Sequence, residues 1–129
     1  MSIGGGADTP HLPRPAPIDA YGDGGFRFAG MSHRGSLLCF PDGIWAWPTQ
    51  NVTEMTEAAL APVFDRAEML DFFLIGAGRD PWPLPEHLRQ RFRELSLSVD
   101  SMPTGAAVRT YNILLAENRR VGAGLIAVA

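Results

Sequence analysis

The chain has 129 residues, 46% apolar and 19% charged, which fits one globular domain with a single core. Its net charge of −3 gives no electrostatic footprint for nucleic acid, and no apolar run approaches the roughly 18–20 residues that span a bilayer. The single cysteine, Cys39, excludes an intramolecular disulfide and fits a reducing compartment. Since no signal peptide is recognisable at the N-terminus, we expect a cytoplasmic protein.

The first half of the chain predicts a tail followed by antiparallel hairpins. Residues 1–15 are rich in glycine and proline, so we expect a flexible tail before one globular domain over residues 16–129. Turn signals at residues 22–25 and 41–43 separate short apolar runs, as in β-hairpins. The expected strands cover residues 18–21, 26–28, 36–40 and 44–47.

The middle of the chain alternates helices and strands. Thr56 is placed as the N-cap of a short helix over residues 57–61, which Pro62 should end or kink. The run over residues 71–75 is continuously apolar, as in a strand buried on both faces. Pro83 and Pro85 then open a helix with an apolar face, and residues 95–99 alternate as in a half-buried strand.

Residues 104–120 form the longest amphipathic stretch, followed by a predicted buried strand over residues 121–128. We expect Thr104 to be the N-cap of the helix and Asn118 to be its left-handed C′ residue. Ile113 is apolar on the polar face, which indicates either another structural layer or a contact with a second subunit. The residues expected to share one buried core are Leu74, Ile75, Tyr111, Leu114, Leu115 and Ile126.

The order β-α-β-α-β in the second half favours a mostly parallel sheet covered by helices. With the N-terminal antiparallel hairpins beside it, the predicted fold is a mixed α/β domain of three layers. The direction of the last strand stays open at this point.

The stretch TGAAVRTYNILLAENRRVGAGLI, which begins at Thr104, resembles the C-terminal signature of a family of small proteins. That family includes a mitochondrial respiratory complex I assembly factor and uncharacterised bacterial and archaeal proteins with the Mth938-like fold. The segments LIGAG at residues 74–78 and GGFRF at residues 24–28 also match it, and the resemblance spans residues 16–128. Ala77 stands where the family pattern has threonine. The resemblance implies a three-layer fold and a respiratory-complex subunit as partner.

No pattern of residues indicates catalysis, a metal site or a cofactor. His11, His33 and His87 have no ligand partner at helical or strand spacing, and Cys39 lies inside an apolar strand. The sequence at residues 76–78 contains half of a dinucleotide fingerprint, but prolines follow where the helix should begin. A tight turn is the better interpretation.

One geometric hypothesis concerns a crevice. If the strands that end at Gly76 and before Thr104 are parallel, both following loops leave the same sheet edge, beside the N-terminus of the long helix. Free N–H groups at residues 105–107 and nearby arginines could then bind a small anion. The residues of this predicted ligand site are Gly76, Gly78, Arg79, Thr104, Gly105, Ala106 and Arg109.

Two functional hypotheses follow. The leading one is a non-enzymatic binding or assembly module, for which Trp45, Trp47 and Trp82 are candidate anchors of a protein partner. The alternative is a small-molecule binding protein or weak enzyme that uses the crevice between residues 76–80 and 104–107. An exposed apolar patch would favour the first hypothesis.

Overall fold

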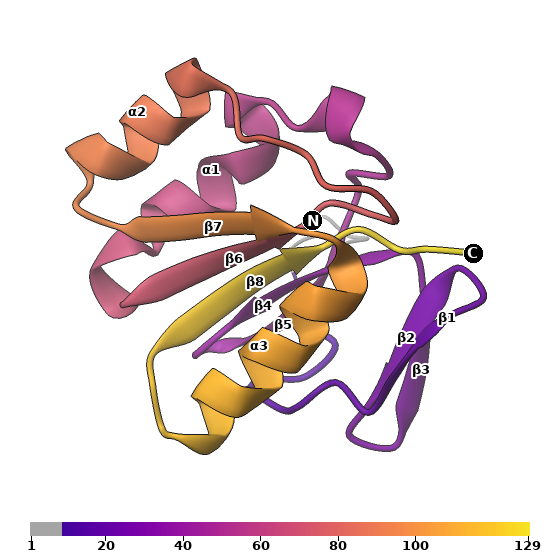
Figure 1. Ribbon diagram of the computed structural model, residues 1–129. Coiled ribbons are helices and arrows are strands. Elements are labelled where there is room, and N and C mark those ends of the chain that lie inside the picture. The colour runs from indigo at the N-terminus through magenta and orange to yellow at the C-terminus, as the bar shows by residue number, and fades with distance from the viewer. Residues whose placement is uncertain (1–8) are drawn as a thin grey trace.

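The computed structural model describes residues 9–129, which form two β-sheets and three α-helices (Figure 1). The three-stranded sheet has the order β1-β2-β3, and the five-stranded sheet has the order β5-β4-β8-β6-β7. Helices α1 and α2 cover one face of the larger sheet, and α3 covers the other (Figure 1). The strands are β1 (Ala20–Gly22), β2 (Gly25–Phe28), β3 (Met31–Arg34), β4 (Ser36–Phe40), β5 (Gly43–Trp47), β6 (Phe72–Gly76), β7 (Ser98–Met102) and β8 (Val121–Leu125), and the α-helices are α1 (Glu57–Asp65), α2 (Glu86–Glu94) and α3 (Thr104–Ala116).

The strand directions confirm the mixed α/β architecture. β6 pairs in parallel with both β7 and β8, so the second half is a parallel β-α-β-α-β unit. β4 pairs antiparallel with β5 and with β8, which joins the N-terminal hairpin to the parallel half. The last strand, whose direction the sequence left open, is therefore parallel to β6 and antiparallel to β4.

The interior consists of two apolar clusters, one on each face of the larger sheet. Ile75 and Ile126 belong to the cluster under α1 and α2, whereas Leu74 and Tyr111 belong to the cluster under α3. The expectation of one shared core was therefore wrong, because adjacent strand residues point to opposite faces. Leu114 and Leu115 are only partly buried and pack at the margin of the second cluster. Ile113 is 53% exposed on the outer side of α3.

The N-terminal region differs from expectation in two ways. The strand β3 was missed, since Met31 to Arg34 alternate without a strong apolar signal. The three short strands β1–β3 form a separate sheet, whose buried Phe26 and Phe28 pack into the α3 cluster. The expected tail falls partly outside the described residues. Within its described part, Leu12 forms an antiparallel bridge with Ile44, so this portion lies against β5.

Several element boundaries also differ from the predictions, such as the last strand, which ends at Leu125, and two of the differences have an identifiable cause. Thr56 caps α1 as expected, by accepting a 3.1 Å hydrogen bond from the N–H of Ala59, but the helix continues through Pro62 to Asp65. Leu60 and Val63 are fully buried on either side of the proline, and this packing holds the helix together where local propensity would end it. The predicted strand over residues 95–99 begins only at Ser98, because Leu95 closes α2 and Ser96 turns the chain with φ 54°.

Candidate functional site

Thr104 connects three segments at the edge of the parallel strands. Its hydroxyl is buried, donates to the carbonyl of Ile126 at 2.7 Å and accepts the N–H of Gly78 at 2.9 Å. Its own N–H donates to the Gly78 carbonyl at 2.8 Å. Thr104 is the first residue of α3 rather than its N-cap, so the capping prediction was wrong. The hydroxyl bonds two segments that are distant in sequence, Gly78 and Ile126. A rule for helix caps considers only neighbouring residues and therefore could not predict these bonds.

The loop after β6 and the start of α3 lie side by side, and a hollow of about 320 Å³ opens between them. Gly76 and Thr104 do not line this hollow, because they are buried beneath it. An added Cβ at Gly76 would lie 3.1 Å from the Cα of Thr104. The predicted site residues that do line the hollow are Gly78, Arg79, Gly105, Ala106 and Arg109.

The donors around this hollow are fewer than predicted. The N–H of Ala107 donates to the Pro103 carbonyl at 3.0 Å, so it is not free as expected. Among residues 9–129, no backbone partner takes the N–H groups of Gly105 and Ala106. Arg79 and Arg109 are exposed at the rim. The hollow therefore offers two backbone donors and two guanidinium groups to a ligand.

Tyr21 is the lining residue that sequence reasoning missed. It comes from the small sheet, is 46% exposed, and covers Gly105 so closely that a Cβ there would collide with its phenol oxygen. No local signal in the sequence could place β1 over the start of α3, because the two segments are more than 80 residues apart. A tyrosine hydroxyl at this position adds a neutral hydrogen-bonding group to the crevice.

The two side chains with the most reactive functional groups are interior. Burial raises the pKa of the Cys39 thiol to about 12, and burial also raises the pKa of Tyr111. The Tyr111 hydroxyl donates to the carbonyl of Ala16 at 3.1 Å. Neither residue lines a hollow found in residues 9–129. Both side chains therefore stabilise the α3 cluster, as predicted for a buried thiol and a packed ring.

The histidines do not assemble a metal site in the part of the chain that the structure describes, where no three His, Cys, Asp or Glu side chains gather around one point. His33 lies in β3, and the centroid of its ring stands 4.6 Å from that of His11. Burial, followed by the neighbouring charge of His11, lowers the pKa of His33. His11 and His33 lie close together because residues 9–12 contact the hairpins.

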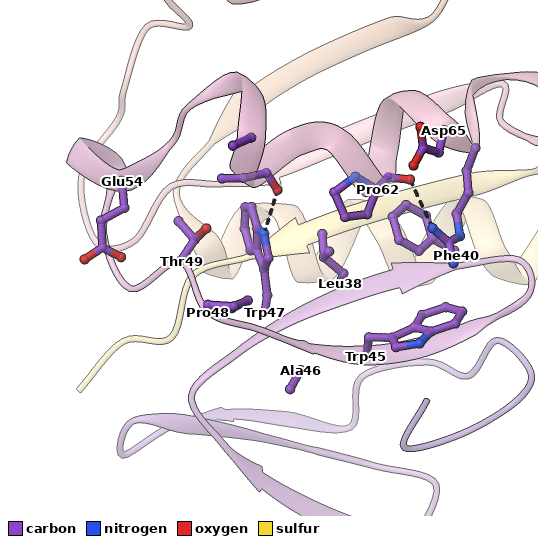
Figure 2. A pocket seen from close by; sticks show the side chains of 13 residues that line it. Leu38, Phe40, Trp45, Ala46, Trp47, Pro48, Thr49, Glu54, Pro62 and Asp65 are labelled. Atoms are coloured by element: carbon purple, nitrogen blue, oxygen red, sulfur yellow. Dashed lines mark hydrogen bonds between the residues drawn. The ribbon is translucent and has the colours of Figure 1, made fainter. Parts of the chain in front are cut away.

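A larger hollow, which we call the β5–α1 groove, has a volume of about 680 Å³ and was not predicted (Figure 2). Trp45 and Trp47, two of the three candidate anchors, line it, while Trp82 lies elsewhere. Trp47 is buried, and its indole N–H donates to the Ala59 carbonyl of α1 at 3.1 Å. Trp45 is half-buried. The residues that line the β5–α1 groove are Leu38, Phe40, Trp45, Ala46, Trp47, Pro48, Thr49, Glu54, Ala58, Ala59, Pro62, Asp65 and Arg66.

Arg66 closes one end of the β5–α1 groove. Its guanidinium lies 4.6 Å from the ring centroids of both Phe40 and Trp45, a distance at which cation–π attraction operates. Its Nε also forms an ion pair with Asp42 at 3.2 Å, so the two charges compensate each other.

None of the helices in residues 9–129 is long and apolar enough to cross a membrane.

Comparisons with known proteins identify relatives over nearly the whole chain. Residues 18–126 match the model of a family described as a protein of unknown function (DUF498/DUF598). The uncharacterized protein RCAP_rcc01784 of Rhodobacter capsulatus is 40% identical over 110 residues, which cover 85% of this chain and 83% of that protein. NADH dehydrogenase (ubiquinone) 1 alpha subcomplex assembly factor 3 of Drosophila melanogaster is 27% identical over 112 residues, which cover 84% of this chain but 57% of the fly protein.

Solved structures share the same fold. A protein of Bartonella henselae described as an outer membrane protein is 49% identical, with a TM-score of 0.88 over 92% of this chain and 100% of that one. A protein of Bordetella pertussis described as an Mth938-like domain is 27% identical, with a TM-score of 0.76 over 87% of this chain and 85% of that one. The fold of this chain is therefore Mth938-like, as its C-terminal signature implied.

Proposed function

The chain belongs to the DUF498/DUF598 family of proteins of unknown function, and on this premise we propose that it is a cytoplasmic, non-enzymatic module that binds other proteins during assembly. The likeness to the fly assembly factor supports a protein partner, and by that likeness the partner is a subunit of a respiratory complex. The chain spans little more than half of the fly protein, so the proposal concerns the shared 112 residues.

The observation that carries this proposal is the contrast between the surface hollows and the interior. The β5–α1 groove is lined by aromatic side chains, and aromatic residues are enriched at the centres of protein interfaces. The thiol of Cys39 and the phenol of Tyr111, in contrast, are buried away from it with raised pKa values. A hollow with aromatic walls, from which the thiol and this phenol are both absent, is suited to binding a partner rather than to catalysis.

Affinity purification from the native organism tests the proposal. The tagged full chain, expressed at its natural level, should enrich respiratory-complex subunits relative to an unrelated tagged protein of similar size and charge, as measured by quantitative mass spectrometry. A strain lacking the gene should also accumulate less assembled complex on native gels. Equal enrichment with the control protein, together with normal amounts of assembled complex in the deletion strain, would contradict the assembly function.

A second candidate function is the binding of a small anion at the crevice between residues 76–80 and 104–107. The observation that favours this function is that four possible anion donors line one hollow. They are the backbone N–H groups of Gly105 and Ala106, which have no backbone partner among residues 9–129, and the guanidinium groups of Arg79 and Arg109. Backbone donors at a helix N-terminus and arginine side chains both favour phosphate and carboxylate groups. The anion would be held by charge and hydrogen bonds, so binding should weaken as salt increases.

An NMR titration with inorganic phosphate and with acetate distinguishes specific anion binding at the crevice from non-specific anion binding at exposed arginine side chains. We expect millimolar affinity and amide shifts confined to residues 76–80 and 104–107. Arg109→Gln should weaken the binding severalfold, whereas Arg27→Gln, which removes an exposed charge in β2, should not. Shifts spread over all exposed arginines, or none at millimolar ligand, would leave the crevice as a packing feature.

A further inference from the structure

We propose that the β5–α1 groove binds an extended segment of the partner protein that carries two basic residues about four positions apart, with apolar residues between them. This inference deepens the proposed assembly function and rests on it, since it names the chemistry of the partner at that surface. Four observations carry it: the shape of the groove, its charges, a buried polar group in its wall, and the spacing of its acidic ends.

The groove has an apolar floor of suitable length. Residues Trp45 to Thr49 line one wall, and at roughly 3.3 Å per strand residue this wall extends about 13 Å. Helix α1 forms the opposite wall with Ala58, Ala59 and Pro62. The indole of Trp47 lies against this helix, to which its N–H donates (Figure 2). A segment of four or five extended residues matches this length.

The uncompensated charge of the groove is negative. Arg66 is paired with Asp42, which leaves Glu54 and Asp65 as lining carboxylates without a cationic partner among residues 9–129. The Glu54 carboxylate accepts the N–H of Gln50 at 2.7 Å, which orients it but does not neutralise it. Electrostatic complementarity therefore favours a basic occupant over an acidic one.

The separation of these carboxylates favours a polymer over a small cation. Glu54 lies in the turn before α1, whereas Asp65 is the last residue of this helix. Figure 2 shows the two side chains at opposite ends of the groove. A compact ligand with one positive group can reach only one of them. An extended chain that lies along the groove and carries a basic side chain toward each end can approach both.

Thr49 supplies a polar anchor inside the groove. It is 4% exposed, and within residues 9–129 its hydroxyl has no hydrogen-bond partner. Figure 2 places it beside Trp47, with its oxygen on the side of the indole. A buried hydroxyl without a partner carries a desolvation penalty, and a peptide carbonyl or N–H in the groove would relieve it.

The first eight residues, MSIGGGAD, contain no lysine or arginine. A partner segment fits the acidic ends of the groove better than this N-terminal stretch does.

The test is an NMR titration of the full chain with two blocked seven-residue peptides. One has lysine at positions 2 and 6 and valine or isoleucine between them, and the other has glutamate at the same two positions. We expect the lysine peptide to shift the amides of residues 45–49 and 58–65 and the indole signal of Trp45, and the glutamate peptide to leave them unchanged. Equal shifts with both peptides, or none at millimolar peptide, would overturn the proposal.

Two sets of variants sharpen the result. The double variant Glu54→Gln with Asp65→Asn should weaken the lysine peptide about three- to tenfold, in keeping with two exposed ion pairs. The matched pair Asp100→Asn with Glu117→Gln, which changes the net charge equally away from the groove, should have no effect. Thr49→Val should weaken the peptide while leaving the thermal midpoint equal or higher. A lower midpoint would assign the hydroxyl a structural role and overturn its part as an anchor.

The peptide titration and the partner purification fail in different ways. If the charge variant captures the same respiratory-complex subunits as the wild type and the peptide does not bind, the groove is not the docking site and the assembly function stands. If the peptide binds the groove but no such subunit is enriched, the assembly function is contradicted on its own.

Discussion

The side-chain amide of Asn112 pairs with both backbone groups of Ile18. Its oxygen accepts the N–H of Ile18 at 2.9 Å, and its nitrogen donates to the carbonyl of the same residue at 2.9 Å. The amide thus substitutes for a neighbouring strand, and it fixes the segment before β1 to the middle of α3. The neighbouring Tyr111 supports the same segment through Ala16.

Asn112→Asp should destabilise the fold, because a carboxylate keeps the acceptor but leaves the Ile18 carbonyl without a donor. We expect a loss of roughly 1–3 kcal/mol in the free energy of unfolding, measured by urea denaturation. Arg109→Ala, on the exposed side of the same helix, is the control and should change stability by less than about 0.5 kcal/mol. Equal stability of the wild type and Asn112→Asp would show that the pair contributes nothing.

Thr104→Val should destabilise the junction of three segments. The substitution keeps the shape but leaves the Ile126 carbonyl and the Gly78 N–H without their partner, so we expect a loss of roughly 2–4 kcal/mol. Thr104→Ser keeps the hydroxyl and should lose less. The measurement is again the free energy of unfolding, and a valine variant as stable as the serine variant would contradict the role of the hydroxyl.

Asn118→Gly should be tolerated, whereas Asn118→Val should destabilise. Asn118 has φ 61°, and the N–H groups of Asn118 and Arg119 donate to the carbonyls of Leu115 and Leu114, as in a Schellman motif. A β-branched residue in this left-handed conformation costs roughly 1–2 kcal/mol, and glycine has no such cost. Thermal melting distinguishes the two variants, and identical midpoints would refute the strain.

Cys39 should be unreactive in the folded protein and should make stability fall at alkaline pH. Burial raises the pKa of the thiol from 9.0 to about 12, so the unfolded chain loses this proton first. The contribution is therefore intact below about pH 9 and decreases as pH rises from 9 toward 12. A disulfide reagent at pH 8 should modify the thiol only after guanidinium is added. Rapid modification of the native protein would contradict its burial.

Ile113→Glu should leave the fold intact, because this side chain is 53% exposed. We expect the change in the free energy of unfolding to stay below about 0.5 kcal/mol. If the outer face of α3 joins two copies of the chain, the wild type should show a mass that rises with concentration in light scattering, and the variant should not. A wild type that is monomeric at every concentration would exclude self-association through this face.

Several features followed from short stretches of sequence because their causes are local. Thr56 caps α1 through a residue three positions away, and Asn118 adopts its left-handed conformation through bonds within two turns of α3. The apolar run of β6 indicated a strand buried on both faces, and the β-α-β-α-β order indicated parallel pairing. The placement of the loop after β6 beside the start of α3 followed from that topology alone.

Other features depend on contacts between residues far apart in the chain, which local patterns do not encode. Thr104 looked like a cap, but its hydroxyl bonds Gly78 and Ile126, which are 26 and 22 residues away. Tyr21 reaches the crevice only because the small sheet packs beside α3. The β5–α1 groove exists because α1 continues past Pro62 and lies over Trp47. Local propensity and periodicity thus determined the elements, whereas long-range packing and hydrogen bonding decided which side chains the hollows present.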